Sequence, residues 1–177
     1  MNLPNRRSIR LREYDYTRQG AYFITVCTTQ RLCLFGEIVD GEVQLSPVGY
    51  VADARWQDLP NHTPRLTLDA WVVMPNHLHG VLILPGTAAP APATADYPGP
   101  AAGSLGRIIG SFKSAVSREV AAKELTLVYP VWQRNYHERI IRNDRELDAI
   151  RGYIHDNPAR WTHDPDHPKM HAPSRHL

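Results

Sequence analysis

Runs of apolar residues along the chain predict the strands of a sheet. Residues 21–28 (AYFITVCT) are β-branched and aromatic, as strand residues are. Residues 66–74 and 77–84 are apolar on both faces, which is typical of central strands covered by helices. Pro75 and Asn76 between these two runs favour a turn, so we expect an antiparallel hairpin. Weaker patterns predict further strands at 31–35, at 42–45 and within 131–141.

Apolar residues at helical spacing predict three helices. The first begins with Ser46 as N-cap and Pro47 at the first helical position, and ends before Pro60. The second spans residues 104–123, and the third runs from its cap, Asn143, to about Asn157. This order of elements predicts an α+β fold, a ferredoxin-like sandwich with helices packed on a central antiparallel sheet.

The length of 177 residues fits a single domain, with its core at about 15–160. Residues 85–102 are rich in Pro, Ala and Thr and predict a flexible insertion. Residues 162–177 place four histidines among prolines and predict a poorly ordered tail. No apolar run approaches the roughly 18 residues of a membrane span, and no signal-peptide pattern opens the chain. With two cysteines expected to be reduced thiols, these features favour a cytoplasmic protein.

The charge of the chain gives only a weak indication of its binding partners. The formal net charge is +2, but arginines gather within residues 1–20 and 134–151. Such clusters suit contacts with phosphate groups, and they are equally typical of an ordinary solvated surface.

Two pairs of residues carry candidate chemistry. His77 and His79 are two apart on a predicted strand, so both imidazoles project from one face, the minimum arrangement for chelating a divalent ion. The alternative is a pair of packed histidines. Tyr153 and Asn157 are four apart on the third helix and share a face. Asn157 could add an oxygen ligand, whereas the alternative is a boundary tyrosine and a helix-ending asparagine.

Five motifs, in order, carry a family resemblance over about residues 15–160. They are residues 70–80 (AWVVMPNHLHG), 109–113 (IGSFK), 131–134 (VWQR), 137–142 (HERIIR) and 153–158 (YIHDNP). With them the chain resembles the HUH-type single-tyrosine transposases, most closely the REP-associated tyrosine transposases.

The resemblance implies that His77, His79 and Asn157 bind Mg²⁺ or Mn²⁺ and that Tyr153 is the nucleophile. Such an enzyme cleaves and rejoins single-stranded DNA near palindromic hairpins through a covalent 5′-phosphotyrosine, as a monomer or homodimer. Two imidazole ligands favour a site that accepts Mn²⁺ well. No general base is evident, although His137 and His155 are candidates.

The DNA contacts expected with this function are basic residues in several parts of the chain: Arg6, Arg10, Lys113, Arg118, Arg134, Arg139 and Arg142. Trp132 is expected either to stack on an unpaired base or to lie in the core. Two other functions fit the sequence: a DNA-hairpin-binding protein without catalysis, and a metal nuclease that hydrolyses nucleic acid without a tyrosyl intermediate.

Overall fold

The computed structural model describes residues 20–84 and 104–168. Arg6, Arg10 and the predicted insertion at 85–102 therefore lie outside the described residues, as does the part of the predicted tail from 169 onward.

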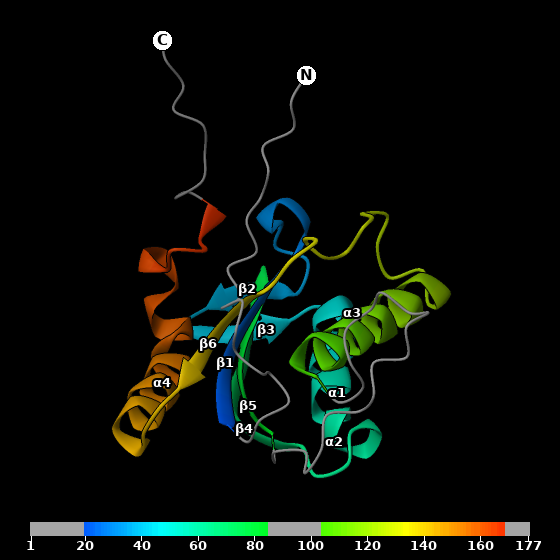
Figure 1. The fold of residues 1–177 in the computed structure, drawn as a ribbon. Coiled ribbons are helices and arrows are strands. Elements are labelled where there is room, and N and C mark those ends of the chain that lie inside the picture. The colour runs from blue at the N-terminus through cyan, green and yellow to red at the C-terminus, as the bar shows by residue number, and fades with distance from the viewer. Residues whose placement is uncertain (1–19, 85–103, 169–177) are drawn as a thin grey trace, which may run out of the picture.

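Four antiparallel strands form the central sheet, in the order β4-β5-β1-β6 (Figure 1). They are β1 (Gly20–Cys27), β4 (Thr67–Met74), β5 (His77–Leu84) and β6 (His137–Ile141). Helix α1 (Pro47–Gln57) connects β1 to β4, and α3 (Leu105–Ala122) lies between β5 and β6 in the chain. This is the βαββαβ order of a ferredoxin-like fold, which confirms the predicted fold class.

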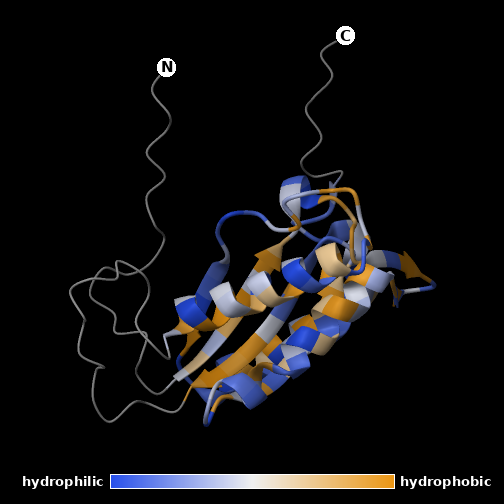
Figure 2. Cartoon of the chain, turned by 90° about the vertical axis from the view of Figure 1, so that its right-hand side faces the viewer, coloured by the Kyte–Doolittle hydropathy of each residue, from blue (hydrophilic) through white to orange (hydrophobic). Residues whose placement is uncertain are grey.

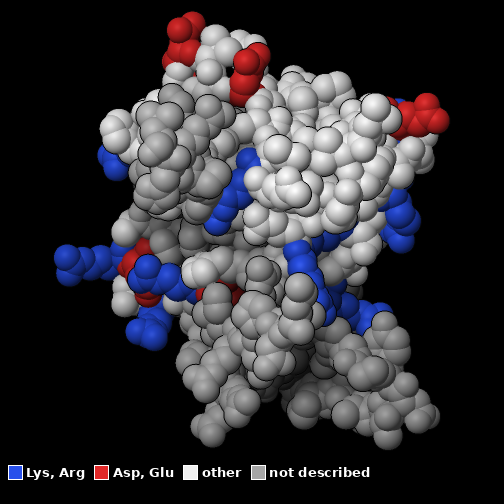
Figure 3. All heavy atoms as spheres, turned by 90° about the horizontal axis from the view of Figure 1, so that it is seen from above, with Lys and Arg blue, Asp and Glu red and all other residues white. Residues whose placement is uncertain are grey.

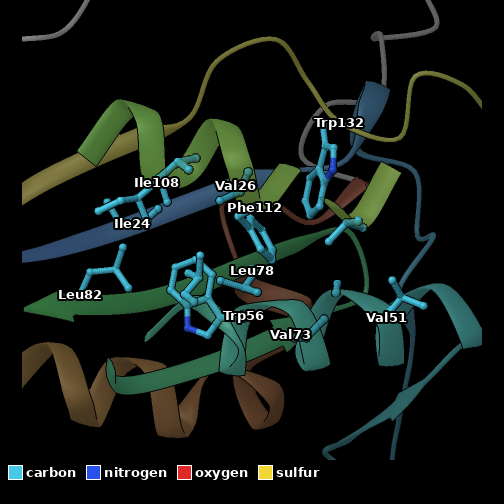
Figure 4. Packing of buried hydrophobic residues seen from close by; sticks show 14 of the residues in the cluster. Ile24, Val26, Val51, Trp56, Val73, Leu78, Leu82, Ile108, Phe112 and Trp132 are labelled. Atoms are coloured by element: carbon cyan, nitrogen blue, oxygen red, sulfur yellow. The ribbon is translucent and has the colours of Figure 1, made fainter. Parts of the chain in front are cut away.

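The two faces of the sheet carry different layers. Helices α1 and α3 cover one face, and α4 (Asp144–Asp156) lies against the other (Figure 1). Because side chains alternate along a strand, Ile24 and Val26 of β1 point into the larger core. Trp56 and Phe112 meet Leu78 there (Figure 4). Phe23 belongs to the smaller cluster under α4. Figure 2 shows the apolar strands beneath helices of mixed polarity.

The helices begin where their capping residues predict. Ser46 accepts a hydrogen bond from the backbone N–H of Gly49, and Asn143 accepts one from that of Glu146. The predicted apolar stripe of α3 is buried against the sheet. Pro60, however, does not end helical structure, because it lies in the first turn of a short helix, α2 (Leu59–His62), where proline is tolerated.

One of the weaker strand predictions is wrong, whereas the strands expected at 42–45 and within 131–141 are confirmed. Residues 31–35 do not form a strand, since Gln30 and Arg31 have positive φ angles of 50° and 56° and the chain turns through the short 3₁₀ helix η1 (Thr29–Arg31). The partner of β3 (Glu42–Leu45) is instead β2 (Gly36–Val39). Within 131–141, only His137–Ile141 is a strand. Before β6, Trp132 forms an isolated antiparallel bridge with Thr28, and the carbonyls of residues 133–135 accept hydrogen bonds from Lys113.

The segment after α4 is ordered where the sequence predicts a tail. It forms the 3₁₀ helix η2 (Pro158–His163) and continues to residue 168, with Asp164 4% exposed. The prediction of poor order from residue 162 is therefore wrong up to residue 168. In the described residues, no helix is both long enough and apolar enough to cross a membrane.

Candidate active site

His77 and His79 lie at the start of β5, a central strand, on the face that α4 covers. They are 0% and 3% exposed, and their ring centroids are 4.3 Å apart. The two imidazoles thus project from one face of the sheet, as the spacing predicts.

The hydrogen bond of His77 assigns the protonated nitrogen of its ring, and both ring nitrogens of His79 contact hydroxyl groups. His77 Nδ1 lies 2.8 Å from the side-chain oxygen of Asn76. Because an amide oxygen only accepts, Nδ1 carries the proton and Nε2 is left bare. Nε2 of His77 is buried and has no hydrogen-bond partner among the described residues. His79 Nδ1 lies 2.9 Å from Thr25 Oγ1, and its Nε2 lies 3.2 Å from the hydroxyl of Tyr153.

Burial keeps both imidazoles neutral. It lowers the pKa of His77 to about 3, assisted by the charge of Arg31. It also lowers the pKa of His79 well below its ordinary value, and the neighbouring His77 acts in the same direction. Neutral imidazole is the form that binds a metal ion, so the rings need not lose a proton first.

Asp164 completes a buried cluster with the two histidines. One ligand atom from each of His77, His79 and Asp164 lies within 4.8 Å of the others. The carboxylate is oriented by the backbone N–H of Asp166, which donates to Asp164 Oδ1 at 2.6 Å. Asp166 is held by an ion pair with Arg31 and by a hydrogen bond from Asn76 to its carbonyl.

Asp164 is not among the residues that the sequence predicts for the site, because residues from 162 onward are expected to form a poorly ordered tail. The available signal was Trp161, a large apolar side chain inside that polar segment. Trp161 packs near His77, with ring centroids 6.0 Å apart.

Tyr153 and Asn157 approach the cluster from α4. The Tyr153 hydroxyl is 3.5 Å from Asp164 Oδ2, and the side chain is 39% exposed. Burial, and next the charge of Asp164, raises the pKa of Tyr153 to about 12. Asn157 is buried and donates from Nδ2 to Asp164 Oδ2 at 2.8 Å. Its Oδ1 has no hydrogen-bond partner among the described residues.

These donors fit a divalent metal ion. Two neutral nitrogens and a carboxylate converge, and the side-chain amide of Asn157 contacts that carboxylate. Two of these atoms, His77 Nε2 and Asn157 Oδ1, are buried without a partner in the described part of the chain. A buried polar atom costs free energy unless it finds a partner, and a metal ion would supply one to both.

A cavity of about 730 Å³ opens beside the cluster, between the sheet and α4. His79 and Tyr153 form part of its lining, together with Phe23 and Thr25 of β1. Arg31 and Arg139 add positive charge to the lining, and Arg139 forms an ion pair with Glu146. The cavity gives an anionic ligand access to the Tyr153 hydroxyl.

The basic residues expected to contact DNA lie on different parts of the protein. Arg139 lines the cavity, whereas Arg134 and Arg142 are exposed beside β6. Figure 3 looks down on the end of the molecule that carries η1 and η2 and shows Lys and Arg side chains spread over that face. Arg118 is exposed on α3, the helix that covers the opposite face of the sheet from Tyr153. Its DNA contact stays a prediction.

Lys113 and Trp132 support a loop. Lys113 Nζ donates to the carbonyl of Gln133 and is 6.0 Å from the ring centroid of Trp132. Burial lowers the pKa of Lys113 to about 8. Trp132 is 6% exposed and packs against Phe35 and Phe112 in the core. Of the two expected roles for Trp132, the structure confirms the core role.

Comparisons with known proteins identify a relative of the chain and a solved structure with the same fold. No family model matches the chain. An uncharacterized protein of Haemophilus influenzae is 36% identical over 176 residues, covering 92% of this chain and 93% of that protein. A REP-associated tyrosine transposase, solved bound to a REP hairpin, superposes with a TM-score of 0.61 over 87% of this chain and 74% of the other, at 20% identity. The chain therefore belongs to one family with the H. influenzae protein and has the fold of a REP-associated tyrosine transposase, which confirms the fold that its motifs predicted.

Proposed function

We propose that the protein is a metal-dependent DNA transposase that cleaves and rejoins single-stranded DNA near hairpins through Tyr153. The observation that carries the proposal is the position of the Tyr153 hydroxyl. It lies at an open cavity, 3.2 Å from His79 Nε2 and 3.5 Å from the carboxylate of a buried His-His-Asp cluster. The fold shared with a transposase bound to a REP hairpin supports the same function.

His77, His79 and Asp164 would hold the metal, Mg²⁺ or Mn²⁺, with Asn157 Oδ1 as a further oxygen donor. Two imidazoles beside oxygen donors favour Mn²⁺, because Mg²⁺ prefers oxygen ligands. When bound, the ion polarises the scissile phosphate and neutralises charge that develops on its oxygens.

Tyr153 supplies the nucleophile. Its oxygen forms a bond to phosphorus while the bond from phosphorus to the 3′ oxygen breaks, which leaves a 5′-phosphotyrosine and a 3′-OH. With a pKa of about 12 the phenol is protonated at neutral pH and must lose its proton as it attacks. Asp164 Oδ2, 3.5 Å from the hydroxyl, is the acceptor within reach once His79 Nε2 is taken by the metal, and the departing 3′ oxygen takes a proton from water. Attack of a 3′-OH on the phosphotyrosine reverses the step and rejoins DNA.

The substrate reaches Tyr153 through the cavity. We infer that a single strand enters it, because Tyr153 lines this cavity, and that phosphate groups would compete with Asp166 and Glu146 for Arg31 and Arg139. Arg134 and Arg142 would extend this contact along the exposed surface beside β6.

The test is a covalent-adduct assay with a hairpin oligonucleotide labelled at its 3′ end and incubated with Mn²⁺. The parent should carry the label on the protein in a denaturing gel, and Tyr153→Phe should not. Tyr129→Phe is the matched control, since Tyr129 is exposed and does not line the cavity. An adduct that survives in Tyr153→Phe would rule out Tyr153 as nucleophile. Hairpin binding without an adduct in either metal would indicate a non-catalytic binding protein, and cleavage without a protein-bound end would indicate a hydrolytic nuclease.

A further inference from the structure

We propose that Thr25 and Asn76 are positioning residues of the metal centre, each of which fixes the tautomer of one histidine so that its Nε2 faces the metal. The inference rests on the proposed function, which supplies the metal. It concerns two polar side chains that are themselves buried, 7% and 0% exposed.

Thr25 lies directly opposite His79 in the register of β1 and β5. Its Oγ1 is 2.9 Å from His79 Nδ1, so the hydroxyl oxygen can accept the Nδ1 proton. Nε2 is then bare and faces the cluster, with the Tyr153 hydroxyl 3.2 Å from it and within donating distance of Asp164 Oδ2. Valine has almost the same shape as threonine but lacks the hydroxyl acceptor. In Thr25→Val, the neutral imidazole of His79 would lose the hydrogen bond that favours a proton on Nδ1.

Asn76 fixes His77 through an amide whose hydrogen-bonding capacity is fully assigned. Its Nδ2 donates to the carbonyls of Arg31, at 3.0 Å, and Asp166, at 2.8 Å. The amide oxygen must therefore face His77 Nδ1, and that nitrogen must carry the proton. The bond to Asp166 also anchors the segment that carries Asp164, so one side chain orients two members of the cluster.

The tautomer of each histidine determines whether its Nε2 can bind the metal. An imidazole binds a metal only through a nitrogen without a proton, and a hydrogen bond at the other nitrogen fixes both the tautomer and the ring orientation. Loss of such a partner lowers metal affinity by about 10- to 100-fold in metalloproteins. We expect a loss in this range for either side chain.

The first experiment reads the tautomers in the metal-free protein by ¹⁵N NMR of labelled histidine. In the parent, His77 and His79 should both carry the proton on Nδ1. Thr25→Val should move the His79 proton toward Nε2 and leave His77 unchanged, and Asn76→Ala should do the reverse. Thr25→Ser, which keeps the hydroxyl, should restore the parent pattern.

The second experiment measures Mn²⁺ affinity by calorimetry on the same proteins, with His79→Ala as the negative control. Thr25→Val should bind Mn²⁺ about 10- to 100-fold more weakly than the parent, and Thr25→Ser should bind nearly as well as the parent. Equal affinity and unchanged tautomers in Thr25→Val, with a parent that binds, would overturn the inference and leave the proposed metal site standing. A parent that has both expected tautomers but binds no Mn²⁺ would overturn the proposed metal dependence together with the positioning role. Thermal unfolding of each metal-free variant identifies any that fails to fold, in which case Thr25→Ala replaces Thr25→Val.

Discussion

Asp164 brings a carboxylate to a group of neutral donors, and its neighbours define its role at the residue scale. It accepts from Asn157, lies near the Tyr153 hydroxyl and clusters with the two histidines. A negative charge there attracts a cation and at the same time disfavours the tyrosinate. In the proposed function, metal binding and activation of Tyr153 would therefore be coupled through this one side chain.

Asp164→Asn should separate the two effects. Loss of the charge should weaken Mn²⁺ binding by at least about 10-fold, measured by calorimetry, because a carboxylate ligand becomes a neutral amide. In the metal-free protein the pKa of Tyr153 should fall below about 12, since the charge of Asp164 helps to raise it. It should stay above the ordinary value of about 10, because burial is the larger cause.

The pKa is measured by ultraviolet titration, with Tyr153→Phe as the baseline. Asp148→Asn on the exposed surface of α4 is the charge-matched control and should change neither quantity. An unchanged Mn²⁺ affinity in Asp164→Asn would exclude Asp164 as a ligand.

Residue spacing in the sequence predicts two pairs of site residues, but it cannot predict that the pairs meet or that Asp164 joins them. His77 with His79, and Tyr153 with Asn157, are pairs within one element, where periodicity decides which side chains share a face. That the pairs meet, and that Asp164 joins them, depends on the docking of α4 and of the segment after it. Those contacts are tertiary, and Asp166 and Asn76, which make one of them, are 90 positions apart.

At the scale of elements, β5 is the strand on which the site depends most. It lies between β4 and β1 and carries both histidines on one face while Leu78 and Leu82 fill the core on the other. Gly80 follows His79 directly and faces Trp56 of α1. A Cβ atom at Gly80 would lie 2.3 Å from the Trp56 ring, so α1 packs here only because the side chain is absent.

Gly80→Ala should therefore destabilise the protein by about 1–3 kcal/mol, the usual cost of overpacking a core. In a Trp56→Leu background the further cost of Gly80→Ala should be smaller, because the ring that it meets is gone. Urea unfolding of the four proteins in this cycle measures the coupling. Gly110→Ala is the matched control: it lies on an exposed position of α3 with no atom within 4 Å, and should stabilise the protein by up to about 1 kcal/mol. Additive effects of Gly80→Ala and Trp56→Leu would contradict this account of the packing.

The elements that sequence predicted well are those with local signals. Caps at Ser46 and Asn143 and the long apolar runs of β1, β4 and β5 fix their own boundaries. The misplaced strand at 31–35 lacks such signals. The positive φ angles at Gln30 and Arg31 accompany contacts of this segment with Asn76 and Asp166, which are remote in the chain. The loop before β6 is likewise held by Lys113 from α3.

At the scale of the whole molecule, the burial of two histidines makes stability depend on pH. An unfolded chain protonates histidine near pH 6.5, whereas His77 in the folded protein resists protonation down to about pH 3. Between these values the unfolded state binds more protons, so stability is complete above pH 6.5 and falls as the pH is lowered.

The metal-free protein should lose about 2 kcal/mol of unfolding free energy between pH 7 and pH 5 from His77 alone, at about 1.4 kcal/mol for each pH unit below 6.5. His79 should add to this loss, because its pKa is lowered in the same direction. Urea unfolding at both pH values, with a chelator present, measures the difference. His77→Gln should reduce it, and His155→Ala, on the exposed surface of α4, should not. A pH dependence that is the same in His77→Gln and the parent would contradict the assigned burial effect.

The residues of the cluster are synthesised at different times. All four strands of the sheet, with His77 and His79, are synthesised by residue 141, and Asp164 follows only after α4 and η2. Since chains fold from their N-terminal part while synthesis continues, the sheet can form with its two histidines in place before their acidic partner has left the ribosome. A nascent chain therefore cannot bring the three side chains of the cluster together until Asp164 has emerged.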